Sequence, residues 1–205
     1  MTSHHTDHTA HAGQEHAGHE GHGGSTRTMA LAATLHCLTG CAIGEIAGLM
    51  IGTALGLGTG WTIVLAVALA FLFGYTLSTL PLLRAGVGVG AALGVVLAAD
   101  TLSIATMEVV DNVVMALIPG AMDAGLVNPV FWVGMAIALT AAFAAAYPVN
   151  VVLLRRGRGH ALTHRYSEAS APTGARRFIP ALATSTLVAA LGAFLLGGLV
   201  VSLAV

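Results

Sequence analysis

Lysine is absent from this sequence, and charged side chains of either sign are scarce. Charged residues make up 8% of the 205 residues, and hydrophobic residues make up 56%. Because a soluble domain carries roughly a quarter charged residues, this composition excludes an ordinary soluble protein. The formal net charge of −1 gives no indication of nucleic-acid binding, so no nucleic acid is expected as a partner. Only two cysteines occur, which excludes a structural disulfide framework.

The sequence contains several long apolar runs with few or no charged residues. A helix that crosses a bilayer needs about 20 apolar residues, and only helices or closed barrels satisfy their own backbone groups in lipid. The sequence therefore predicts an all-α integral membrane protein with about five transmembrane helices, embedded in a lipid bilayer. The predicted spans are residues 30–57, 61–83, 87–118, 130–154 and 178–204.

The arginines predict how the chain is oriented. All eight lie before the first span, after the second, or between the fourth and fifth, in the loop of residues 155–177. Since basic residues stay on the cytoplasmic side, the N-terminus is expected in the cytoplasm of a multi-pass protein of the bacterial inner membrane. Trp61 and Trp132 fall at the opposite ends of their spans, where tryptophan typically anchors a helix at the interface.

Histidines crowd the N-terminal residues. Residues 1–28 lack an apolar run and are predicted to form a disordered, His-rich tail before the membrane domain of residues 29–205. Spaced imidazoles on a flexible chain hold Cu(II), Zn(II), Ni(II) or Co(II) weakly, although a merely solvated tail is the alternative. The histidines of the tail are His4, His5, His8, His11, His16, His19 and His22.

The first predicted span contains ionisable and thiol side chains, which are unusual in a membrane helix. His36, Cys37, Cys41 and Glu45 lie in an otherwise apolar stretch. Thiolate and imidazole are ligands that copper and zinc prefer, and ionisable groups within a span indicate a functional site. On a helix, Cys37, Cys41 and Glu45 form one row, while His36 points about a quarter turn away. The alternative is that the two cysteines are ordinary small membrane-helix residues.

A second row on the same span consists of glycines at every fourth position. Such a groove lets another helix approach closely, so a partner helix or a second copy of the chain is expected to pack there, beside the thiols and Glu45. The glycines of the row are Gly40, Gly44, Gly48, Gly52 and Gly56, with Gly60 in phase.

The third span is too long for a straight crossing and carries Asp100, Glu108 and Asp111 on one side. These acids are expected to face the bundle interior, because each would cost several kcal/mol against lipid. They would then be neutral, share protons or hold a cation. Met107 and Met115 lie on the same side; they are further candidate ligands, since thioethers suit Cu(I), or simple gap-fillers.

Three stretches resemble a bacterial membrane family catalogued only as domain of unknown function 4396. They are HCLTGCAIGEIAGLMIG from His36, FGYTLSTLPLLR from Phe73 and DTLSIATMEVVDNVVMALIPG from Asp100. The resemblance covers about residues 34–160, and the pattern His-Cys-x3-Cys-x3-Glu is its most specific part. It implies a small multi-span protein, in a family where some members are linked to copper-handling modules, and it brings no established activity.

Together these features predict a protein that binds and transports a transition metal ion, with copper favoured over zinc, nickel or cobalt. The chain has no nucleotide-binding loop, and it is not expected to be an enzyme or to hold a tightly bound cofactor. Two alternatives stay open. One is a membrane thiol oxidoreductase that uses Cys37 and Cys41, and the other is an assembly protein that binds a partner through the glycine groove.

Overall fold

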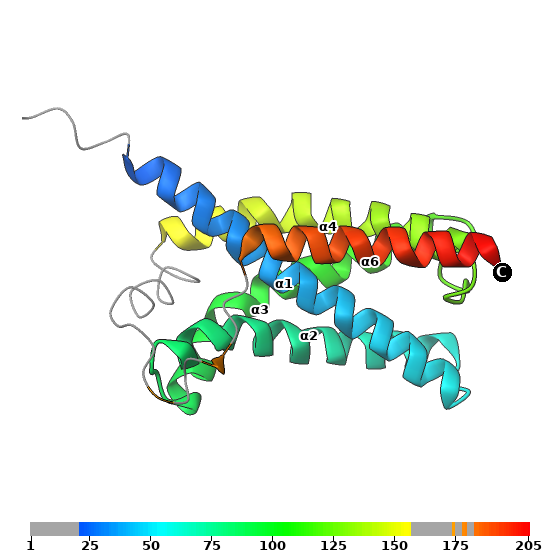
Figure 1. The fold of residues 1–205 in the computed structure, drawn as a ribbon, viewed down its shortest axis with the longest axis horizontal. Coiled ribbons are helices and arrows are strands. Elements are labelled where there is room, and N and C mark those ends of the chain that lie inside the picture. Colours follow the sequence, from blue (N-terminus) through cyan, green and yellow to red (C-terminus); the bar gives the residue numbers. More distant parts are fainter. Residues whose placement is uncertain (1–20, 157–173, 175–177, 180–182) are drawn as a thin grey trace, which may run out of the picture.

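The computed structural model describes residues 21–156, 174, 178–179 and 183–205. The regular structure of this part of the chain is helical and contains no strand, which confirms the prediction of an all-α fold. The helices lie side by side along one direction, with α1 crossing the bundle diagonally (Figure 1). They are α1 (Gly21–Ala54), α2 (Thr59–Arg84), α3 (Val89–Leu117), α4 (Pro129–Arg155) and α6 (Thr184–Ala204).

Four of these helices are long and apolar enough to cross a membrane, and α3 is the fifth if its two parts count as one span. The part Val89–Ala98 meets the part Asp100–Leu117 at an angle of 52°. Next to the bend, the Thr101 hydroxyl donates a hydrogen bond to the carbonyl of Leu97. Threonine bonds of this kind compete with the helix ladder and bend helices, so the bent third span agrees with the expectation from its length.

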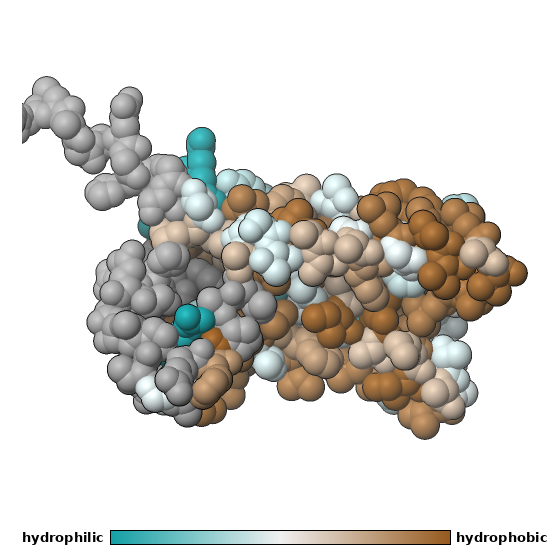
Figure 2. Space-filling view, in the orientation of Figure 1, coloured by the Kyte–Doolittle hydropathy of each residue, from teal (hydrophilic) through white to brown (hydrophobic). Residues whose placement is uncertain are grey.

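The two ends of the bundle differ in charge. The described arginines, Arg27, Arg84, Arg155 and Arg156, all lie where α1 begins and where α2 and α4 end. In Figure 2 the teal, hydrophilic side chains of the visible face gather at this end, and brown apolar surface covers the helices. The opposite end consists of the turn of residues 55–58 and the connection of residues 118–128.

Two expectations need correction. Residues 21–28 were expected to belong to the disordered tail, but helix α1 begins at Gly21. These residues are helical because extending an existing helix costs far less than starting one.

The two tryptophans were both expected at the membrane interface. Trp61 is 72% exposed, as an interface anchor should be, but Trp132 is only 6% exposed. Its indole nitrogen donates to the carbonyl of Leu126 at 2.7 Å, and its ring packs edge-on against Phe194 of α6. The loop of residues 157–173 lies outside the described residues.

The glycine row of α1 packs against α2 of the same chain. A Cβ atom added at Gly44 or Gly48 would collide with the backbone of Ala70 or Ala66, and Gly40 and Gly52 have equally close neighbours on α2. These glycines are therefore not available to a second copy. Gly56 does not belong to the row, because it lies in the turn after α1 with a φ of +65°.

A buried hydrogen bond ties α1 to α4. The side-chain amide of Asn150 donates to the hydroxyl of Thr34 at 2.8 Å, and both residues are buried. Thr34→Val should lower the free energy of unfolding by about 0.6 kcal/mol, the average measured for such bonds between membrane helices, and by no more than about 1.7 kcal/mol, the largest value measured. Reversible unfolding in mixed micelles measures the change. The exposed Thr140, which bonds only to its own helix, is the control: Thr140→Val should alter stability by less than Thr34→Val.

Candidate functional site

Three side chains of α1 face three carboxylates of α3. The Cys37 thiol lies against the carboxyl group of Asp100, the Cys41 thiol lies against Glu108, and Glu45 lies against Asp111. We call these three contacts the pair ladder. Because α1 and α3 run in the same direction, the order is the same on both helices. Successive α1 members of the ladder are about 6 Å apart along the helix axis.

The two thiols lie deep inside the bundle. Cys37 and Cys41 are 0% and 1% exposed, and neither forms a disulfide. The span of α1 is Thr26–Ala54, so both cysteines lie near its middle. Cys37 also has a neighbour on α2, since its sulfur is 3.8 Å from the hydroxyl oxygen of Ser78. The ladder therefore begins among three helices, close to the midplane expected for the membrane.

The carboxylates of the ladder are poorly satisfied by the protein itself. Apart from the contacts of the pair ladder, neither carboxyl oxygen of Glu108 has a hydrogen-bond donor among the described residues, and Oδ1 of Asp111 is equally buried and has none. Both side chains are buried. An isolated buried carboxylate costs several kcal/mol. No arginine can neutralise Glu108 or Asp111, because the described arginines all lie at the start of α1 and at the ends of α2 and α4. These groups must be protonated or accompanied by a cation.

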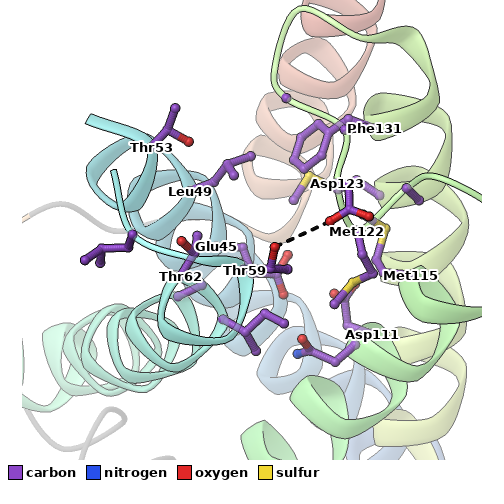
Figure 3. A pocket seen from close by; sticks show the side chains of 18 of the residues that line it. Glu45, Leu49, Thr53, Thr59, Thr62, Asp111, Met115, Met122, Asp123 and Phe131 are labelled. Carbon is purple, nitrogen blue, oxygen red and sulfur yellow. Dashed lines mark hydrogen bonds between the residues drawn. The ribbon is translucent and has the colours of Figure 1, made fainter. Parts of the chain in front are cut away.

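A cavity of about 310 Å³ lies at the end of the ladder. Glu45, Glu108 and Asp111 line its inner part. At the end of the bundle away from the arginines, the cavity reaches Leu57 in the turn after α1 and Asp123 in the connection before α4. Figure 3 shows Asp111 and Met115 on one side of this space and Glu45 with Thr62 on the other. The Thr59 hydroxyl donates to a carboxyl oxygen of Asp123 at 3.4 Å across the mouth (Figure 3).

The other predicted ligands do not join the ladder. His36 bonds through Nδ1 to the carbonyl of Ala32 at 2.8 Å. Met107 is buried in the apolar core, whereas Met115 lines the cavity. His22 lies in the first turn of α1, and the other histidines of the tail lie outside the described residues. Within the described ranges, no three His, Cys, Asp or Glu side chains gather closely enough to hold a metal ion together.

Several residues of the site were not singled out from the sequence. Ser78 could have been found from the sequence, because it belongs to a short polar segment that starts at Tyr75 within an otherwise apolar helix. Met122 and Asp123 lie in the connection before α4, where no periodicity indicates their direction. Met135 is one methionine in an apolar helix, and only the packing of α4 brings it to the cavity.

The profile of the family described as Domain of unknown function (DUF4396) matches residues 26–159. The chain belongs to this family. The match covers α1 to α4 and hence every member of the pair ladder, while α6 lies beyond it. No curated protein and no solved structure matches the chain.

Proposed function

We propose that this protein binds a transition metal ion inside the bilayer and transports it along the pair ladder. The observation that carries the proposal is the pairing of Cys37, Cys41 and Glu45 of α1 with the carboxylates of α3. Thiolate and carboxylate are both metal ligands, and each pair holds protons that an arriving cation can displace. Such an exchange lets the ion move one way while protons move the other.

The depth of the thiols argues against the oxidoreductase alternative. A thiol that exchanges with a partner's disulfide must be reachable as thiolate, whereas Cys37 and Cys41 are enclosed by neighbouring helices. A thiol oxidoreductase would trap its partner in a mixed disulfide that Cys37→Ser or Cys41→Ser abolishes. We expect no such trapping, and we expect metal content to depend on both cysteines.

The orientation follows from the arginines. With the arginine end in the cytoplasm of a bacterial inner membrane, the cavity opens on the outer side. The seven histidines of the tail then lie on the cytoplasmic side, where they hold copper, or zinc, nickel or cobalt, close to the start of α1. Labelling of a cysteine introduced at Thr59, in a Cys37→Ser/Cys41→Ser background, should succeed from outside the cell with a reagent that cannot cross the membrane.

The proposal is tested by metal analysis of the purified full chain, followed by metal uptake into proteoliposomes. The unsubstituted protein should bind metal. The Cys37→Ser/Cys41→Ser variant should bind at most half as much, and its metal uptake should be at least tenfold lower. Replacing the seven histidines of the tail by serine should reduce binding but leave uptake measurable. Met50→Leu, at an exposed position of α1, is the control. Metal-free protein in every case would refute the proposal.

A further inference from the structure

Three methionines from separate parts of the chain line the cavity. They are Met115 of α3, Met122 of the connection of residues 118–128 and Met135 of α4. The sulfur of Met115 packs so closely on α4 that a Cβ atom at Gly134 would lie 3.1 Å from it. Thioethers are uncharged, and they bind soft ions such as Cu(I) in preference to hard divalent ions.

The lining of the cavity admits cations and disfavours anions. Its four acidic residues are Glu45, Glu108, Asp111 and Asp123, and the set of lining residues includes no basic side chain. Glu108 is only 4% exposed and lines the cavity, and its neighbour in the pair ladder is the Cys41 thiol, a weak donor. No other donor among the described residues reaches either of its oxygens, and a buried carboxyl group with so little hydrogen bonding calls for an explanation. A bound cation would supply the missing partner.

The size of the cavity suits an ion that keeps part of its hydration shell. A single water needs about 10–15 Å³ of cavity space, so a cavity of about 310 Å³ has room for an ion together with several waters. The walls combine those charged groups with the polar side chains of Thr59, Thr62 and Asn112. An ion can therefore enter with water and exchange it for protein ligands further in.

The arrangement of ligands favours a monovalent ion of low coordination number. Zinc in proteins is almost always bound by four ligands in structural sites and by three plus water in catalytic ones. Here the described part of the chain offers ligands in pairs, not in groups of three. A sulfur and a carboxylate recur together, as Met122 with Asp123 and Met115 with Asp111 at the cavity and as Cys41 with Glu108 in the ladder.

We propose that this cavity is a binding chamber for a soft monovalent cation, Cu(I) or Ag(I), held by methionine sulfur together with the carboxylate of either Glu108 or Asp111. The chamber is where the ion joins or leaves the Cys41–Glu108 pair. Its role in transport rests on the proposed function, but its ion preference is a property of the chamber alone. One carboxylate balances the single charge of the ion, and a neutral thioether completes the coordination without adding charge.

Competition with a Cu(I) chelator, under anaerobic reducing conditions, tests the chamber in the purified full chain. The variant is Met115→Leu/Met122→Leu/Met135→Leu, because leucine keeps the volume and removes only the sulfur. We expect the affinities for Cu(I) and Ag(I) to fall at least tenfold and the affinity for Co(II) to change less than twofold. Met50→Leu, exposed on α1, should change none of them.

X-ray absorption at the copper edge gives a second measurement that does not depend on the triple variant folding. In Cys37→Ser/Cys41→Ser protein, the remaining sulfurs are thioethers, so copper–sulfur scattering must come from methionine. Absence of that scattering, or a triple variant with unchanged Cu(I) affinity, would overturn the inference. If the protein then still binds Co(II) or Zn(II) through its cysteines, the proposed function survives. If it binds no metal ion at all, both fail.

Discussion

Glu108→Gln is expected to reduce metal uptake into proteoliposomes at least tenfold while the protein remains folded. Glutamine matches the shape of glutamate but carries no charge, so the Cys41 thiol keeps a neighbour of the same size. What disappears is the carboxylate that lies between the thiol and the cavity. A tenfold loss corresponds to about 1.4 kcal/mol, which is modest for the removal of a charged ligand because Glu45 and Asp111 remain at the cavity.

The stability of the same variant separates a transport role from a structural one. If Glu108 served only to hold α3 against α1, Glu108→Gln would lower the free energy of unfolding and leave uptake per folded molecule unchanged. We expect uptake to fall and the free energy of unfolding to change little, because glutamine keeps a side chain of the same size beside the Cys41 thiol and removes a buried charge. Glu108→Asp keeps the charge but withdraws it by one methylene, and it should restore part of the uptake. Equal loss in both variants would contradict a role for the charge.

Gly44→Leu should prevent the protein from folding into a stable bundle. The Cβ atom alone would collide with the backbone of Ala70, and backbone atoms cannot move aside as a flexible side chain can. Overpacking a core typically costs 1–3 kcal/mol, and a leucine between two helix backbones should exceed the upper end of that range. The yield of monodisperse protein from size-exclusion chromatography and its melting temperature measure the effect.

Gly94→Leu is the matched control for this substitution. Gly94 also lies inside a helix, α3, but a Cβ atom there meets nothing within 4 Å. The residue exchange and the gain in helix propensity are the same, and only the neighbouring helix differs. If both variants fold equally well, the close approach of α1 and α2 is not what the glycine row provides.

The helices were predictable because a bilayer leaves few alternatives. Each span was placed from its apolar run, and the described helices begin or end within a few residues of the expected limits, except at Gly21 and at the start of α6. Helix period alone places Cys37, Cys41 and Glu45 on one face, and the glutamate predicts that this face points inward because lipid excludes it. The acids of α3 had to face inward as well, because lipid excludes them.

The sequence could not indicate which helix fills which groove. The glycine row was compatible with a second copy of the chain or with any neighbouring helix, and only the packed structure identifies α2. The cavity was hidden for a similar reason, because Asp123 and Met122 belong to a connection whose path depends on α3 and α4 together. Trp132 was placed at the interface by its position in the sequence, whereas the neighbouring α6 covers it.

The contact between α1 and α2 determines which parts of the bundle can move relative to one another. Where backbones touch through glycine, no side chain can change rotamer to absorb a displacement, so the two helices act as one stiff body. The ladder joins this body to α3, a helix already bent beside Asp100. If the contacts of the ladder separate, we expect a tilt of α3 beyond the bend to separate them, because α1 and α2 have no room to shift against each other.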